Sequence, residues 1–178
     1  MASFSAPPTR LLLREKHGLK YFEGPPSVTP QEGKLPSVLE IDPSLSHGDE
    51  GAQRQGPYFS SDGCKLLFVG KLGDPMVVRD VATGRPLCTI DCTDAEHAYF
   101  SPKGTFVVSF SSAKRGTETS SPPPNLCIWR VGTNGAAASM EAGFHLKRNT
   151  QNSLPVQWTA DEQICARVNT NEVRTHYT

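Results

Sequence analysis

The sequence lacks an excess of charge of either sign, because its 178 residues carry 18 Lys and Arg against 18 Asp and Glu. A balanced net charge gives no overall electric field that would attract nucleic acid or a membrane, although it does not exclude local basic clusters. The sequence also lacks any run approaching the roughly 20 apolar residues that a membrane-spanning helix needs. We therefore expect no membrane partner.

The short motifs of common active sites are also missing. The chain contains no Gly-x-Gly-x-x-Gly, no Gly-x-x-x-x-Gly-Lys-Ser/Thr, no His-Glu-x-x-His and no Gly-x-Ser-x-Gly. Cys88 and Cys92 would need two further ligands to hold zinc, and none is near them in the sequence. The sequence therefore predicts that the chain is not an enzyme, with no catalytic, cofactor-binding or metal site and no small-molecule substrate.

A disulfide framework is not expected either. The five cysteines are odd in number and scattered, and four of them lie within apolar runs. This pattern is typical of reduced, buried thiols in a cytosolic protein, so we predict a cytoplasmic location. Residues 1–14 contain Arg10 and Arg14 but no acid, which leaves a mitochondrial transit peptide as the alternative to a tail that enters a strand.

Glycine and proline, in contrast, are frequent, with 15 of each, and without a collagen-like period they predict many turns. An aromatic residue before a polar turn and an apolar strand recurs at Phe59, Phe100 and Trp158. The first two are 41 residues apart, within the period of about 40–45 residues of a WD40 repeat. The second interval, 58 residues, is longer because a polar, Pro-ended insertion occupies residues 112–124.

Each repeat continues with further short strands. In the first repeat, strands at 76–81 and 86–91 flank a turn that contains Gly84, and Gly135 marks the corresponding turn of the second repeat. Four short strands per repeat, with no clear helical periodicity, predict an all-β fold, namely a WD40-like β-propeller of about three four-stranded antiparallel blades. Closed rings hold at least four blades, so we expect an incomplete propeller whose ring is not closed.

The same pattern predicts a domain organisation. We expect a flexible N-terminus at 1–10 and a partial β-propeller at 11–178. Its parts are blades at about 57–95, 96–145 and 153–178 (incomplete), an irregular linker at 23–55 with one strand-like island at 38–41, and a loop insertion at 112–124.

Several motifs match one known family in order. They are Gly18-Leu-Lys-Tyr21, Gly24-Pro-Pro26, Phe59-Ser-Ser-Asp-Gly63, Phe100-Ser-Pro-Lys103, Pro124-Asn-Leu126, Trp158 before an acidic turn, Cys165-Ala-Arg167 and Asn171-Glu-Val173. From about Leu11 to Thr178 the chain resembles the N-terminal third of the eukaryotic translation initiation factor 2A family, whose propeller has nine blades. The segment 27–55 is longer and more acidic than the family pattern.

The resemblance implies a function and its partners. It implies a cytoplasmic factor that associates with the small ribosomal subunit and helps to place initiator methionyl-tRNA on mRNA without itself using GTP; other initiation factors are further possible partners. The alternative is a generic WD40-type scaffold for protein interactions, which includes the related propeller of subunit b of initiation factor 3.

Candidate contact residues for RNA or the ribosome are two basic pairs in predicted loops, Lys114 with Arg115 and Lys147 with Arg148. Such pairs neutralise phosphates, whereas the simpler interpretation is solvated loop charge. The recurring aromatic residues favour a core between blades over a base-stacking surface. His97 is a candidate for the buried polar contact that ties strands together in WD40 blades.

Overall fold

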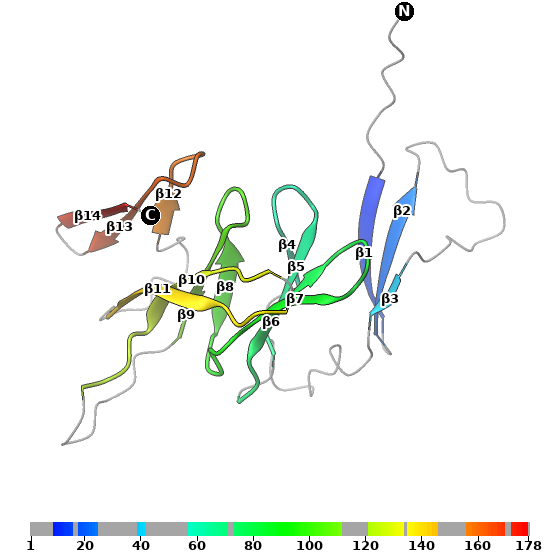
Figure 1. Cartoon of the computed structure of the whole chain (residues 1–178), viewed down its shortest axis with the longest axis horizontal. Coiled ribbons are helices and arrows are strands. Elements are labelled where there is room, and N and C mark those ends of the chain that lie inside the picture. The colour runs from blue at the N-terminus through cyan, green and yellow to red at the C-terminus, as the bar shows by residue number, and fades with distance from the viewer. Residues whose placement is uncertain are drawn as a thin grey trace, which may run out of the picture.

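The chain folds into antiparallel β-sheets that follow one another along the sequence. The computed structural model describes residues 9–15, 18–24, 39–41, 57–70, 73–111, 121–133, 135–145, 156–169 and 172–177, and within them every regular element is a strand. Figure 1 shows four sheets side by side in chain order, from the blue N-terminal sheet to the orange and red C-terminal one. The all-β prediction is confirmed.

The first sheet has the order β1-β2-β3. Its strands are β1 (Thr9–Glu15), β2 (Gly18–Gly24) and β3 (Leu39–Ile41). β1 begins inside the segment expected to be a flexible N-terminus, and β3 lies inside the expected linker, at its strand-like island. The sequence pattern does not assign β3 to a sheet, because its partner, Leu19 to Tyr21 of β2, lies about twenty residues earlier in the chain.

The second and third sheets are complete four-stranded meanders. The second contains β4 (Tyr58–Phe59), β5 (Lys65–Phe68), β6 (Met76–Asp80) and β7 (Pro86–Ile90). The third contains β8 (His97–Phe100), β9 (Phe106–Phe110), β10 (Leu126–Arg130) and β11 (Ser139–Phe144). Their first strands, β4 and β8, lie next to each other, as the inner strands of neighbouring propeller blades do.

The fourth sheet has three strands in the order β12-β13-β14. They are β12 (Val156–Trp158), β13 (Ile164–Asn169) and β14 (Glu172–Tyr177). Hairpin-built sheets in chain order, with no sheet closed on itself among the described residues, form an incomplete WD40-like β-propeller. The predicted fold class is therefore confirmed.

Among the described residues the core lies between sheets, in one cluster between the second and third sheets and another between the third and fourth. β9 shows this arrangement, because all five of its residues are buried and its four apolar residues belong to two different clusters. Val107 belongs to the cluster shared with the second sheet, and Phe106, Val108 and Phe110 belong to the cluster shared with the fourth. A strand covered on both faces carries a continuous apolar run, as residues 106–108 do.

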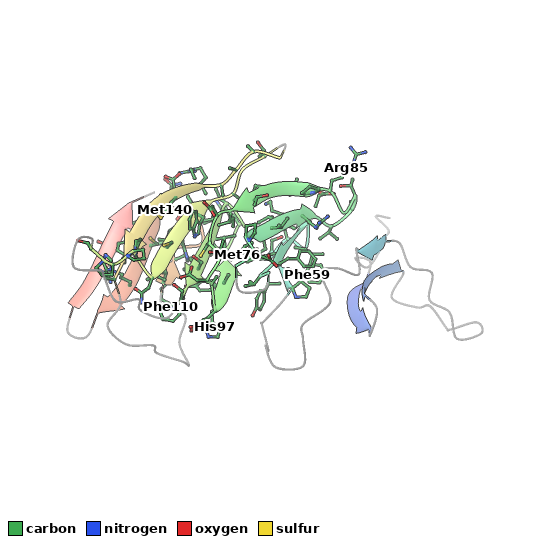
Figure 2. The ribbon with its side chains drawn as sticks, turned by 90° about the horizontal axis from the view of Figure 1, so that it is seen from below. Phe59, Met76, Arg85, His97, Phe110 and Met140 are labelled. Carbon is green, nitrogen blue, oxygen red and sulfur yellow. The ribbon has the colours of Figure 1, made fainter. Side chains whose placement is uncertain are left out.

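Two of the three recurring aromatic residues pack between blades as predicted. Phe100 packs against the cluster between the second and third sheets. Trp158 stacks on Phe106 of the third sheet, with ring centroids 5.2 Å apart. Phe59 differs, because it is 36% exposed and lies outside both clusters of the described residues (Figure 2). It occupies the equivalent position on the face of the second sheet that is turned away from the third.

Candidate functional site

The two predicted basic pairs, Lys114 with Arg115 and Lys147 with Arg148, lie outside the described residues. The structure does describe the strand ends from which their segments leave. In the third sheet Leu126 pairs with Phe110 on one side and with Phe144 on the other. We call this end of the third sheet, where these three residues and His97 lie, the loop edge.

Backbone hydrogen bonds between the strands continue to the last described residues of the loop edge. Ser111 N–H donates to the Asn125 carbonyl at 2.8 Å, and Asn125 N–H donates to the Phe144 carbonyl at 3.0 Å. Adjacent strands are about 4.8 Å apart, so Phe110 and Phe144 are separated by about 10 Å. Ser111 and His145, the last described residues before two gaps, therefore both lie at this edge.

The connection from β7 to β8 ends at the same edge. Glu96 N–H donates to the Phe110 carbonyl at 2.8 Å, and His97 pairs with Phe110 (Figure 2). Asp91 of this connection is exposed, whereas Asp94 and Glu96 are half-buried. The described charged side chains of this connection are therefore acidic.

A buried polar contact ties the strands of the third sheet, but His97 does not make it. Trp129 Nε1 donates to Ser109 Oγ at 2.8 Å, and Cys92 Sγ donates to the same oxygen at 3.5 Å. His97 is half-buried on β8. Sequence reasoning missed Ser109, although a lone hydroxyl in the apolar strand β9 was a usable signal, since a buried hydroxyl needs a partner.

The opposite end of the sheets carries three equivalent turns. They join the first two strands of the second, third and fourth sheets, and we call them the first turn (60–65), the second turn (101–106) and the third turn (159–164). In each, the opening hydroxyl side chain accepts a hydrogen bond from the N–H that begins the next strand. These bonds are Lys65 N to Ser60 Oγ at 2.9 Å, Phe106 N to Ser101 Oγ at 2.9 Å and Ile164 N to Thr159 Oγ1 at 3.1 Å.

An aspartate stabilises the first and the third turn from within. Asp62 Oδ1 accepts from Cys64 N–H at 2.9 Å, and Asp161 Oδ1 accepts from Gln163 N–H at 3.1 Å. Burial alone would raise the pKa of Asp62, but the hydrogen bonds from Ser60 and Cys64 lower it. The hydrogen bond from Thr159 lowers the pKa of Asp161. Both groups therefore act as fixed carboxylates that hold turns.

The described residues hold no group of three His, Cys, Asp or Glu side chains that could bind a metal ion. They also include no helix that is long and apolar enough to cross a membrane. The five cysteines are free thiols, with Cys64 exposed, Cys92 half-buried and the other three, Cys88, Cys127 and Cys165, buried.

The sheets and their repeated turns define the class of the protein as a β-propeller. No protein-family profile matches the chain. Among solved structures, a eukaryotic initiation factor aligns with 98% of this chain at 18% identity, with a TM-score of 0.69. The chain spans 38% of the length of that protein. The likeness shows a translation-factor-like propeller fold, and at this identity it shows the fold alone.

Two bacterial structures correct one prediction. A proposed 6-phosphogluconolactonase from Bacteroides fragilis aligns with 96% of this chain and 51% of its own at 13% identity and a TM-score of 0.46. Another, from Bacteroides uniformis, aligns with 90% of this chain and 44% of its own at 12% identity and a TM-score of 0.44.

The prediction that the chain is not an enzyme is therefore wrong as an exclusion, because structures named as enzymes align with most of the chain. The physical reason is that a site can be assembled from side chains on separate blades, which no short local motif records. With TM-scores below 0.5, these two alignments assign no activity to this chain.

Proposed function

We propose that the chain is part of a cytoplasmic translation initiation factor that associates with the small ribosomal subunit and supports the placement of initiator methionyl-tRNA. The observation that carries the proposal is the alignment of 98% of the chain with a eukaryotic initiation factor at a TM-score of 0.69. The ordered motifs from Gly18 to Val173 support the same assignment.

The proposed contact surface is the loop edge with the segments that leave it. Lys114, Arg115, Lys147 and Arg148 are the proposed contacts to phosphates of ribosomal RNA. A cation that neutralises a phosphate releases a condensed counterion, so binding of this kind weakens steeply as salt rises. Two pairs at one edge would act as one surface, since their loops start about 10 Å apart.

Sucrose-gradient sedimentation of the tagged full-length protein tests the association. We expect co-migration with small ribosomal subunits at low salt and its loss as the salt concentration rises. If the protein stays at the top of the gradient at every salt concentration, the proposal is wrong. A generic scaffold for protein interactions, the alternative, would give that result while still recovering protein partners.

Charge reversal tests the contact residues. The single variants K114E, R115E, K147E and R148E should each weaken subunit binding, and each should lower the salt slope by about 1, because each removes one cation that neutralises a phosphate. R85E is the matched control, because Arg85 is exposed in the β6–β7 turn, far from the loop edge (Figure 2). Equal weakening in the control and the four variants would contradict a specific role for the loop edge.

A further inference from the structure

Glu162 occupies a backbone position that the two equivalent turns give to glycine. Its φ is 61°, beside 68° at Gly63 and 69° at Gly104, and it is the one non-glycine residue with positive φ among those described. A side chain in this region is crowded by its own backbone, so the conformation persists only where the surroundings enforce it. Glu162 is also buried, with 3% of its surface exposed. A strained, buried carboxylate points to a specific contact.

That contact is with the second turn, in the neighbouring sheet. Glu162 Oε1 accepts a hydrogen bond from Lys103 N–H at 2.5 Å. The side chains of Ser101 and Thr105 and the backbone N–H of Thr105 also hydrogen-bond to the carboxylate. Burial alone would raise the pKa of Glu162, but these hydrogen bonds outweigh it and lower the pKa, so the group is ionised at neutral pH.

The groups that surround Glu162 are those that an internal aspartate holds in the other two turns. In the first turn, Asp62 accepts from the opening hydroxyl of Ser60 and from the N–H two residues after itself. In the third turn, Asp161 accepts from the opening hydroxyl of Thr159 and again from the N–H two residues on. The second turn has Lys103 at the aspartate position, so it has no carboxylate of its own.

We infer that Glu162 supplies, from the third turn, the carboxylate that the second turn lacks, and that this contact positions the fourth sheet against the third. Lys103 completes the joint, because its Nζ donates to the Asp161 carbonyl at 3.1 Å. The joint between the second and third sheets is made differently, by a hydrogen bond from Ser61 Oγ to the Pro102 carbonyl.

This shared carboxylate also makes the joint between the third and fourth sheets selective. A blade with glycine in place of Glu162 would leave the second turn without a carboxylate. A preceding blade with aspartate in place of Lys103 would bring two carboxylates to the same N–H groups, which is unfavourable. Residues 103 and 162 therefore act as a matched pair of positioning residues that specifies which blades can be neighbours.

A double-mutant cycle with amide hydrogen exchange tests the inference on the full 178-residue chain. E162G relieves the positive φ but removes the carboxylate, so exchange at the Thr105 N–H should become faster by about tenfold or more. K103D should also make exchange at the Thr105 N–H faster, because the new carboxylate would repel that of Glu162. The double variant K103D/E162G gives each turn its own carboxylate, and slow exchange at Thr105 should return. The Cys64 N–H, held by Asp62 in the first turn, is the internal control.

Rescue by the double variant separates this role from a merely structural one, because two independent destabilising changes would add. Unchanged exchange at Thr105 in E162G, or a double variant no slower than the faster single variant, overturns the inference. If the variants do not fold, an NMR titration of the unmodified chain decides. As the pH falls, the amide signals of Lys103 and Thr105 must shift together, at a pH below the ordinary glutamate range. The neighbouring charged groups are Asp161, Lys103 and Lys65. If the two amide signals do not shift in that range, the inference is overturned.

Discussion

At the scale of single residues, two glycines with positive φ show that the same backbone conformation can occur in different surroundings. Gly104 has a φ of 69°, and a Cβ there would lie 3.2 Å from Ser60 Cβ and 3.3 Å from Lys65 Nζ. Gly135 has a φ of 80°, but a Cβ there would meet nothing within 4 Å. The two glycines therefore share a backbone requirement and differ in their surroundings.

This difference gives a matched pair of substitutions. G135A should lower the free energy of unfolding by about 1 kcal/mol, which is the cost of a side chain at positive φ. G104A should lower it by about 2 kcal/mol, because Ser60 or Lys65 must also move. Urea unfolding followed by circular dichroism measures both values. A decrease in G135A equal to or larger than that in G104A would show that the close contacts to the first turn have no energetic weight.

The thiols differ in exposure and hence in reactivity. Cys64 is exposed and should react first with a disulfide reagent such as Ellman's reagent. Burial raises the pKa of the Cys127 thiol to about 11, with smaller contributions from Cys92 and Asp94. At pH 8 this lowers its thiolate fraction by about a hundredfold, so it should react only on unfolding. C64S should abolish the fast phase, and a fast phase that persists in C64S would contradict this order.

At the scale of elements, contacts between inner strands hold neighbouring sheets together. Tyr99 of β8 reaches the start of β12, where its hydroxyl donates to the Val156 carbonyl at 3.3 Å and accepts from Val156 N–H at 3.1 Å. Val156 is buried, with 2% of its surface exposed. Burial raises the pKa of Tyr99, so the hydroxyl stays protonated at neutral pH.

Y99F should therefore loosen the joint between the third and fourth sheets. It leaves two buried backbone groups of Val156 without this partner, which costs about 1–3 kcal/mol. Amide exchange in β13 should become faster, whereas exchange in β6 of the second sheet should not change. Uniform acceleration in both strands would mean that the hydroxyl acts on the whole chain and not on this joint.

The sequence predicted most elements because their signals are local. The strands after Phe59, Phe100 and Trp158 and the glycine turns at Gly84 and Gly135 follow from short apolar runs and from turn chemistry. The contact of Glu162 with Lys103 could not be predicted, because it joins residues 59 positions apart. The register of β3 and the role of Ser109 depend in the same way on partners about twenty residues away in the chain. The exposure of Phe59 depends on which sheet covers its face.

At the scale of the whole molecule, several carboxylates couple stability to pH. Hydrogen bonds lower the pKa of Asp62, Asp161, Glu162 and Glu141, the last through Arg130 Nε at 2.9 Å. A group whose pKa is lower in the folded state stabilises the fold above its unfolded pKa, and this contribution disappears as the pH falls through the folded pKa.

Stability should therefore be level between about pH 7 and pH 5 and should fall below about pH 4.5. Urea midpoints measured from pH 7 to pH 3 give the profile. E162Q should flatten part of the acid limb, because it removes one of the carboxylates whose pKa the fold lowers. A profile that falls already between pH 7 and pH 5 would point to other titrating groups.

We propose different roles for the two ends of the sheets. The turns at one end join neighbouring sheets through hydrogen bonds, and the loop edge at the other end is where the chain leaves the third sheet toward the proposed contact residues. Substitutions at the two ends should accordingly separate stability from binding.

The positions of the two tryptophans have a practical consequence for following how the sheets separate. Trp129 belongs to the cluster between the second and third sheets, and Trp158 stacks on Phe106 between the third and fourth. They are the only indoles in the chain, so each emission signal reports on one junction. Replacing either with phenylalanine leaves a single intrinsic fluorophore, with which the order of opening of the two junctions can be timed without an added dye.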